Sequence, residues 1–456
     1  MLEDASANPN DLQSYWLPFT PNRSFKERPR LLVKGEGMYY WDKAGRKILD
    51  AISGLWCVNA GHAQKSIVAA IQAQAAELDY APSFHFAHPK VVTLAARLTA
   101  LAPKGLENVF FCNSGSEAAD TAMKIARGYF SAKGQGGRYQ FVSRARSYHG
   151  VNFGGMSLGG LPNNLKGFGP LVPGTEHRLP LPYDPARDRY SKGEPEGGAG
   201  YADALETICA EQGADTIAAV IVEPMTGSGG VFASPKAYLP RLREICDRHG
   251  VLMIADEVMA GWGRTGKWFS VDHWNVKPDI LVTAKGITSA YVPLGLCATT
   301  TKLAEYFEDH YFSHGHTYEA HPITLGPAVA TIEEMQRLKL VERAASLEPY
   351  VREKLEALKE KHPSIGDVRG LGLFFAVELV KNRKTKEPLN TMRDKVEGKP
   401  MVVEQIAAKM MADGVAQQAW VSHFVIAPPL IVTKDEIDLG IATLDKHLAI
   451  ADALIE

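Results

Sequence analysis

Short apolar runs alternate with amphipathic stretches over the first two thirds of the chain. The runs at 109–112, 217–222, 251–255 and 280–282 are apolar at successive positions, which is typical of strands buried on both faces. Amphipathic stretches such as 117–129 lie between them and predict helices. This alternation predicts an α/β fold with a mostly parallel sheet whose two faces are both covered by helices.

The pattern changes at about residue 325. Apolar positions at helical spacing predict one long helix up to about residue 360. A strand is predicted at 373–379, and helices at 401–413 and 434–453. These elements predict a smaller α+β domain.

Two further stretches complete the predicted organisation. Alternating apolar positions at 31–60 predict strands that join the small domain. Residues 161–200 are rich in proline and glycine and predict a long surface loop. The expected segments are an arm and strands at 1–60, a large domain at 61–325 and a small C-terminal domain at 326–456.

Composition narrows the classes of function. The 456 residues carry 50 Lys and Arg against 52 Asp and Glu, a net charge of −2, and 45% of them are hydrophobic. This apolar content excludes a mainly disordered chain, and the near-neutral charge argues against nucleic acid or an anionic membrane as partner. The five cysteines show no CxxC spacing, and no apolar run approaches the roughly 18 residues of a membrane helix. We expect a cytoplasmic protein.

Two ionisable residues follow buried strands. Lys285 comes after the run at 280–282, where apolar surroundings would lower the pKa of its amine and make it a nucleophile, although a solvated lysine is the plainer interpretation. Asp256 ends the run at 251–255, where open α/β sheets bind ligands, although it would also suit a helix N-cap or a metal. Their separation of 29 residues fits one helix and a returning strand. An acid beside a Schiff-base lysine is the pair that a pyridoxal phosphate enzyme requires.

Small residues begin the helix predicted at 117–129. In Ser114-Gly115-Ser116 they follow a strand and expose backbone N–H groups at a helix N-terminus, which favours a phosphate. A capping box from Asn113 to Ser116 is the alternative. Tyr148 follows another strand and could stack on a flat ring or belong to the core.

Three other motifs lack the context that their chemistry needs. Gly155-Met156-Ser157-Leu158-Gly159 matches a nucleophile elbow, but glycines and a proline flank it in place of a strand and a helix. Gly370-Leu371-Gly372 lacks the third glycine of a dinucleotide fingerprint. A predicted loop gathers histidines with few acidic neighbours, so we expect no metal site there. These histidines are His310, His314, His316 and His321.

Five motifs occur in one order along the chain. They are Ser114-Gly115-Ser116-Glu117-Ala118, Tyr148-His149-Gly150, Glu223-Pro224, Asp256-Glu257-Val258 with Gly263-Arg264-Thr265-Gly266, and Lys285-Gly286. Together they resemble the class III, or omega, aminotransferases of pyridoxal phosphate fold type I. The segment 54–62 looks like the omega-amino acid:pyruvate branch, whereas the ending at 427–430 looks more like taurine-type transaminases.

The resemblance covers nearly the whole chain and implies an activity. An omega-amino acid or primary amine, of the β-alanine, taurine, 4-aminobutyrate or diamine type, would give its amino group to pyruvate or 2-oxoglutarate by a ping-pong mechanism. Another fold-type I enzyme, an aminomutase or a decarboxylase, would share the cofactor residues and is the alternative.

The resemblance also implies roles for single residues. Lys285 would carry the cofactor as a Schiff base and move the proton, and Asp256 would pair with the ring nitrogen. Thr317 would reach the phosphate of a neighbouring subunit, which implies a homodimer with shared active sites and leaves a tetramer open. The other cofactor contacts would be Ser114, Gly115, Ser116, Tyr148, Glu223 and Val258, and the substrate pocket would be lined by Phe19, Trp56, Phe84 and Tyr148.

One segment departs from the family pattern. Omega-amino acid:pyruvate members usually carry an arginine shortly before the final Pro-Pro, where it grips the carboxylate of the keto acid. The segment 414–426 contains no arginine. Trp420 and His423 are the candidates to replace it in substrate binding, unless another arginine reaches in or His423 faces solvent.

Overall fold

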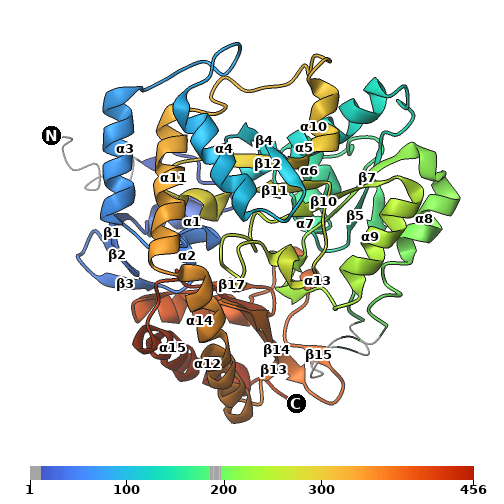
Figure 1. Ribbon diagram of the computed structural model, residues 1–456. Helices are drawn as coiled ribbons and strands as arrows, with labels where there is room; N and C mark the ends of the chain where they lie inside the picture. The colour runs from blue at the N-terminus through green and yellow to red at the C-terminus, as the bar shows by residue number, and fades with distance from the viewer. Residues whose placement is uncertain (1–11, 185–187, 189–194, 196) are drawn as a thin grey trace.

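The computed structural model describes residues 12–184, 188, 195 and 197–456, and its main element is a seven-stranded sheet (Figure 1). Its strands lie in the order β4-β12-β11-β10-β7-β5-β6. In that order they span Leu106–Cys112, Gly295–Thr300, Ile280–Thr283, Leu252–Asp256, Ile217–Val222, Gln140–Arg144 and His177–Leu179. Only β12 runs antiparallel to its neighbours. The predicted mostly parallel sheet is confirmed.

Helices cover both faces of this sheet. Val220 of β7 belongs to the apolar cluster that includes α8 (Ala204–Gln212) and α9 (Tyr238–His249), whereas Ile221 packs in the cluster that contains α5 (Gly115–Ala132). Successive side chains of a strand point to opposite faces, and both of these are fully buried. The continuous apolar runs therefore arise because both faces of the sheet are buried, as the sequence predicted.

A second sheet, which is antiparallel, is built by the C-terminal part of the chain. Its order is β13-β14-β18-β17, with β15 beside β14. In chain order, β13 to β15 and then β17 and β18 span Ile365–Leu371, Phe374–Asn382, Glu387–Pro388, Gln418–Trp420 and His423–Ile426. Helices α12 (Leu340–Lys361), α14 (Val402–Ala412) and α15 (Lys434–Asp452) lie with it at the lower end of the molecule in Figure 1.

The N-terminal strands pair with the C-terminal part of the chain. The strands β1 (Leu32–Glu36), β2 (Tyr39–Asp42) and β3 (Lys47–Asp50) form an antiparallel meander. Strand β3 pairs in parallel with β16 (Val415–Ala416). The domain boundaries expected near residues 60 and 325 stay predictions.

Two predicted elements are wrong. The helix expected from about 325 to 360 is two helices, α11 (Pro322–Arg337) and α12, because Lys339 takes a left-handed conformation with φ 50°. A non-glycine residue rarely adopts positive φ, and the apolar period does not reveal it. The stretch 161–200 is not only a loop, since it contains α7 (Pro162–Leu165) and β6, the last strand of the large sheet.

The remaining elements connect these layers. They are the helices α1 (Asn22–Glu27), α2 (Ser53–Trp56), α3 (Lys65–Glu77), α4 (Pro89–Leu101), α6 (Phe153–Leu158), α10 (Thr301–Ala304) and α13 (Met392–Val396), the strands β8 (Met225–Thr226) and β9 (Phe232–Ala233), and the short 3-10 turns Ala214–Thr216, Ser270–His273, Lys285–Thr288 and Glu305–Phe307. In the part of the chain that the structure describes, none of the helices has the length and apolar surface needed to cross a bilayer.

Candidate functional site

Lys285 and Asp256 lie at the same edge of the large sheet. Asp256 is the last residue of β10 and pairs in register with Val282 of the parallel strand β11. Lys285 follows β11 after one intervening residue and begins a 3-10 turn with φ 51°. A lysine in the left-handed region persists only where the surrounding structure holds it. The fold therefore fixes the backbone from which the amine projects.

The surroundings of the Lys285 amine favour its neutral form. Burial lowers the pKa of Lys285, and the neighbouring side chains of Cys57, Asp256 and Glu223 partly oppose that shift. The Nζ atom lies 5.7 Å from the centre of the Trp56 ring. A larger fraction of this amine is therefore unprotonated near neutral pH than for a lysine in water.

A buried histidine holds the Asp256 carboxylate. His149 Nδ1 lies 2.7 Å from Asp256 Oδ2, and the backbone N–H of Val258 donates to Oδ1 over 3.0 Å. Asp256 is 4% exposed and His149 is 2% exposed. Within the described residues, the Nε2 atom of His149 is buried without a hydrogen-bond partner. The carboxylate is thus fixed on two sides.

Glu223 and Tyr148 complete this edge. Glu223 follows β7, the parallel neighbour of β10, and burial raises its pKa. Its carboxylate accepts the backbone N–H of Tyr148 at 3.4 Å and that of Gly227 at 3.1 Å. Burial also raises the pKa of the Tyr148 phenol, and the negative charge of Asp256 adds to that rise. Residues that follow three different strands thus converge here.

The N-terminus of α5 lies against the same cluster. A Cβ added to Gly115 would lie 2.9 Å from Val258 Cγ1 and 3.5 Å from Ala284 Cβ, so the first turn touches the neighbours of Asp256 and Lys285. Ser114 is the N-cap and accepts the N–H of Glu117 over 3.1 Å. The expected cap from Asn113 to Ser116 is wrong by one residue.

Gly150 packs against this helix start so closely that a side chain would not fit at its position. A Cβ on Gly150 would lie 2.6 Å from Ser116 Oγ, and that hydroxyl accepts the N–H of Val151 over 3.1 Å. The N–H groups of a helix start and the helix dipole together attract an anion. This end of α5 is therefore suited to a phosphate beside Lys285 and Asp256.

Three of the predicted residues lie on the surface of the single chain. Phe19 is 80% exposed and Phe84 is 56% exposed. Thr317 is also exposed, and its carbonyl accepts the hydroxyl of Tyr80 at 3.0 Å. Phe84 packs on Gly315, where an added Cβ would lie 2.7 Å from the Phe84 ring. Phe84 and the Thr317 loop therefore lie together, outside the buried cluster.

Trp420 and His423 face each other across β17 and β18 and line a cavity of about 120 Å³. Arg146, Arg369 and Glu378 line the same cavity. His423 is only 6% exposed, so the alternative in which it faces solvent is wrong. Burial lowers the pKa of His423 well below its usual value, and Arg369 and Arg146 lower it further. Its imidazole is therefore neutral near neutral pH.

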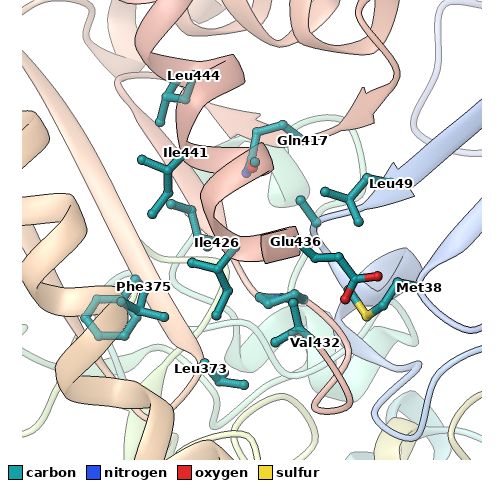
Figure 2. A pocket seen from close by; sticks show the side chains of 15 residues that line it. Met38, Leu49, Leu373, Phe375, Gln417, Ile426, Val432, Glu436, Ile441 and Leu444 are labelled. Carbon is teal, nitrogen blue, oxygen red and sulfur yellow. The ribbon is translucent and has the colours of Figure 1, made fainter. Parts of the chain in front are cut away.

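Gln417, in the segment that lacks the expected arginine, points away from that cavity. Its amide donates to the carbonyls of Gln418 and Val425, at 3.1 and 2.5 Å. Figure 2 shows it in a small apolar pocket with Ile426, Ile441 and Leu49. The volume of about 30 Å³ suffices for a water molecule but not for a substrate.

The structure also places Ser157 of the motif that resembles a nucleophile elbow. Ser157 is buried in α6, where its hydroxyl accepts the N–H of Val172 at 3.0 Å. No group of three potential metal ligands is found among the described residues. The motif Tyr148-His149-Gly150 predicted no role for His149, whose partner Asp256 is 107 positions away in sequence. The histidine next to the aromatic residue was the available signal.

Comparison with known proteins gives a single family. The model of the family Aminotransferase class-III matches residues 22–448. An omega-aminotransferase of Caulobacter vibrioides is 43% identical over 453 residues, which covers 97% of this chain and 99% of that protein. The omega-amino acid--pyruvate aminotransferase of Pseudomonas putida is 41% identical over 377 residues, 81% of this chain and 83% of that one. The solved structure of an amine transaminase from an uncultivated Pseudomonas species, in its PLP-bound form, has a TM-score of 0.89 at 37% identity and covers 96% of this chain and 98% of that one.

Proposed function

We propose that this chain, which belongs to the class III aminotransferases, moves the amino group of an omega-amino acid or another primary amine to pyruvate by a ping-pong reaction. Membership of the family confirms the predicted enzyme class and its cofactor, pyridoxal phosphate. The observation that carries the proposal is the half-buried Lys285, whose amine has a lowered pKa, beside the buried Asp256–His149 pair. Pyruvate is the expected acceptor because the Pseudomonas putida relative is named for it.

The residues at the sheet edge fit the cofactor. The helix start at Ser114, Gly115 and Ser116 would bind the phosphate, because its N–H groups and dipole favour an anion. Asp256 would keep a proton on the ring nitrogen, and His149 would hold Asp256 in place. The bound cofactor supplies the electron sink for breaking a bond beside the amine nitrogen.

Other side chains would position the ring. Tyr148 would stack on one face and Val258 would pack on the other, since Val258 lies between Asp256 and the start of α5. Glu223 would fix the backbone of Tyr148 through the hydrogen bond to its N–H. These contacts would leave the Lys285 amine free to act beside the ring.

Lys285 would move the proton. A general base works best when its pKa lies near the operating pH, and burial lowers the pKa of this amine. Its Nζ atom would take a proton from the donor carbon and return it at another atom. The Trp56 ring, whose centre lies 5.7 Å from Nζ, would flank the amine on one side.

The exposed residues would complete the site of a second copy. Phe19, Phe84 and Thr317 lie on the surface of the single chain, so we assign them to a homodimer in which Thr317 reaches the partner's phosphate. Trp56 and Tyr148 would line the substrate pocket of their own chain. Trp420 and His423 would contact the acceptor carboxylate from the cavity that they line.

A donor panel tests the proposal. The enzyme loaded with pyridoxal phosphate is given β-alanine, taurine, 4-aminobutyrate or a diamine, with pyruvate or 2-oxoglutarate, and both products are quantified. We expect alanine in equal amount to the donor consumed and the parallel double-reciprocal lines of ping-pong kinetics. Sustained turnover without a keto acid, with release of CO₂ or an isomerised amine, would overturn it in favour of a decarboxylase or an aminomutase.

A further inference from the structure

The turn that carries Trp56 has an unusual backbone. Ser53, Gly54 and Trp56 have φ values of 50°, 65° and 58°. Only glycine adopts the left-handed region freely, because a Cβ there approaches the following carbonyl oxygen. Ser53 and Trp56 therefore keep this conformation only if other groups hold it.

Asp50 supplies part of that hold. It is fully buried, and its carboxylate accepts the N–H of Gly54 at 2.8 and 3.0 Å and that of Ile52 at 3.2 Å. His62 Nε2 lies 2.9 Å from Asp50 Oδ2. The ring of Tyr40 lies 4.2 Å from the His62 ring and limits its movement. His62 thus holds the Asp50 carboxylate in place while the carboxylate binds the turn.

A second set of contacts anchors Ser53. Its hydroxyl donates to the carbonyl of Ala427 at 2.7 Å and accepts from Arg264 at 2.9 Å. Arg264 is fully buried and also binds the side chain of Asn59 at 3.1 Å. The turn is therefore attached at Ser53 and at Gly54, two residues before Trp56.

The turn places Trp56 beside Lys285. Its ring centre lies 5.7 Å from Lys285 Nζ. Its indole Nε1 is buried, and no hydrogen-bond partner for it is found in the described part of the chain. The ring packs against the apolar cluster that contains Met225 and Met259, and the backbone of the turn sets the point from which it projects.

We propose that Asp50 is a positioning residue that sets the size of the amine accepted, because it holds the Ser53–Trp56 turn and thereby the Trp56 ring beside Lys285. This inference rests on the proposed function, in which Trp56 lines the substrate pocket. Asp50 itself touches neither substrate nor cofactor. A shift of about 1 Å in a positioning group changes rates by up to about 10²-fold.

The test compares Asp50→Asn with a matched control, Asp42→Asn. Asp42 also closes a turn, since its carboxylate accepts the N–H of Arg46 at 2.9 Å and its Nε at 3.1 Å, but it contacts no residue of the Trp56 turn. The readout is the ratio of kcat/KM for 1-phenylethylamine to that for propylamine. We expect Asp50→Asn to raise this ratio about tenfold with unchanged cofactor content, and Asp42→Asn to leave it within twofold. Equal ratios for the two variants would overturn the proposal.

A double mutant separates positioning from general damage. Trp56→Ala should raise the same ratio, and adding Asp50→Asn to it should change the ratio by less than twofold, because Asp50 acts through Trp56. A further tenfold change in the double mutant would overturn the proposal.

Two outcomes distinguish this inference from the proposed function. If Asp50→Asn fails to fold, His62→Leu is used instead, because it removes one contact of the Asp50 carboxylate. We expect His62→Leu to raise the kcat/KM ratio about threefold. An unchanged ratio would contradict the role of Asp50. If Trp56→Ala leaves the ratio unchanged while amine and pyruvate still react, the inference falls and the aminotransferase assignment stands.

Discussion

The carboxyl edge of the large sheet and the β17–β18 edge of the C-terminal sheet were both predicted to carry site residues. At the first edge, Asp256 meets His149, which is 107 positions away in sequence, and both lie near Glu223. At the second edge, Trp420 and His423 line a cavity with Arg146 and Arg369. The two edges therefore differ in their neighbours: other predicted site residues lie around Asp256, whereas arginines that were not predicted lie around His423.

Strand direction explains the difference. Parallel strands end at the same edge of a sheet, so residues that follow different strands converge there whatever their distance in sequence. Antiparallel strands end at alternate edges, and a residue at such an end has neighbours that the chain order does not indicate. Position after a strand is thus a strong guide in the large sheet and a weak one in the C-terminal sheet.

Replacing Lys285 gives the largest expected effect. Lys285→Ala should lower turnover by at least about 10³-fold, because it removes the group that moves the proton and binds the cofactor covalently. The measurement is alanine formation from pyruvate and the best donor, with exposed Lys277→Ala as the control that keeps its activity. Wild-type rates in Lys285→Ala would refute the role of the carboxyl edge.

Asp256→Asn is expected to have the second largest effect. The amide keeps the size of the side chain but loses the charge that holds a proton on the ring nitrogen, so turnover should fall by about 10²-fold or more with cofactor still bound. Turnover and bound cofactor are measured on the same preparation. A rate within about twofold of wild type would mean that another group protonates the ring.

His149→Phe should have a smaller effect at the same edge. The ring stays, but the contact of 2.7 Å with Asp256 is lost. A hydrogen bond to a charged group contributes about 1.5–3 kcal/mol, so kcat should fall roughly 10- to 100-fold. The kcat of the variant is compared with that of Asp256→Asn and of the double mutant. Fully additive losses would show that His149 does not act through Asp256.

The expected effect at the β17–β18 edge is weaker. His423→Ala should raise the KM for pyruvate about threefold, the size of a lost neutral hydrogen bond. Its pKa is well below the usual value, so the imidazole gains its proton only at low pH and the increase should be the same at pH 6.5 and pH 9. An increase that grows toward pH 6.5 would show that a charged His423 binds the carboxylate.

The last expected effect concerns stability and not activity, because it lies in the packing beneath the C-terminal sheet. Gly440 lies within α15 and lines the small apolar pocket of Figure 2, where an added Cβ would lie 3.9 Å from Leu49. Gly440→Ala should stabilise the protein by about 1 kcal/mol, because alanine favours the helix. Thermal unfolding measures it against Gly326→Ala in α11, where the Cβ would lie only 3.0 Å from Gln74 Oε1. Equal changes in the free energy of unfolding for both variants would show that the space around the added Cβ does not matter.

The sequence was informative where one local rule decides the structure. Continuous apolar runs predicted the doubly covered sheet, and the ends of two of them predicted that Lys285 and Asp256 lie together. His149 was not assigned because its partner is distant in the chain, and the break at Lys339 was missed because positive φ leaves no mark in the apolar pattern. The hold of Asp50 on the Trp56 turn depends on tertiary contacts that no spacing reveals.

One measurement tests the central assignment most directly. The enzyme loaded with pyridoxal phosphate is reduced with borohydride, digested, and its peptides are sequenced by mass spectrometry. The predicted result is a phosphopyridoxyl group on Lys285 in the wild type and none in Lys285→Ala. A modified lysine elsewhere in the wild type, or the same labelling in both proteins, would contradict the assignment of the active site to the carboxyl edge of the large sheet.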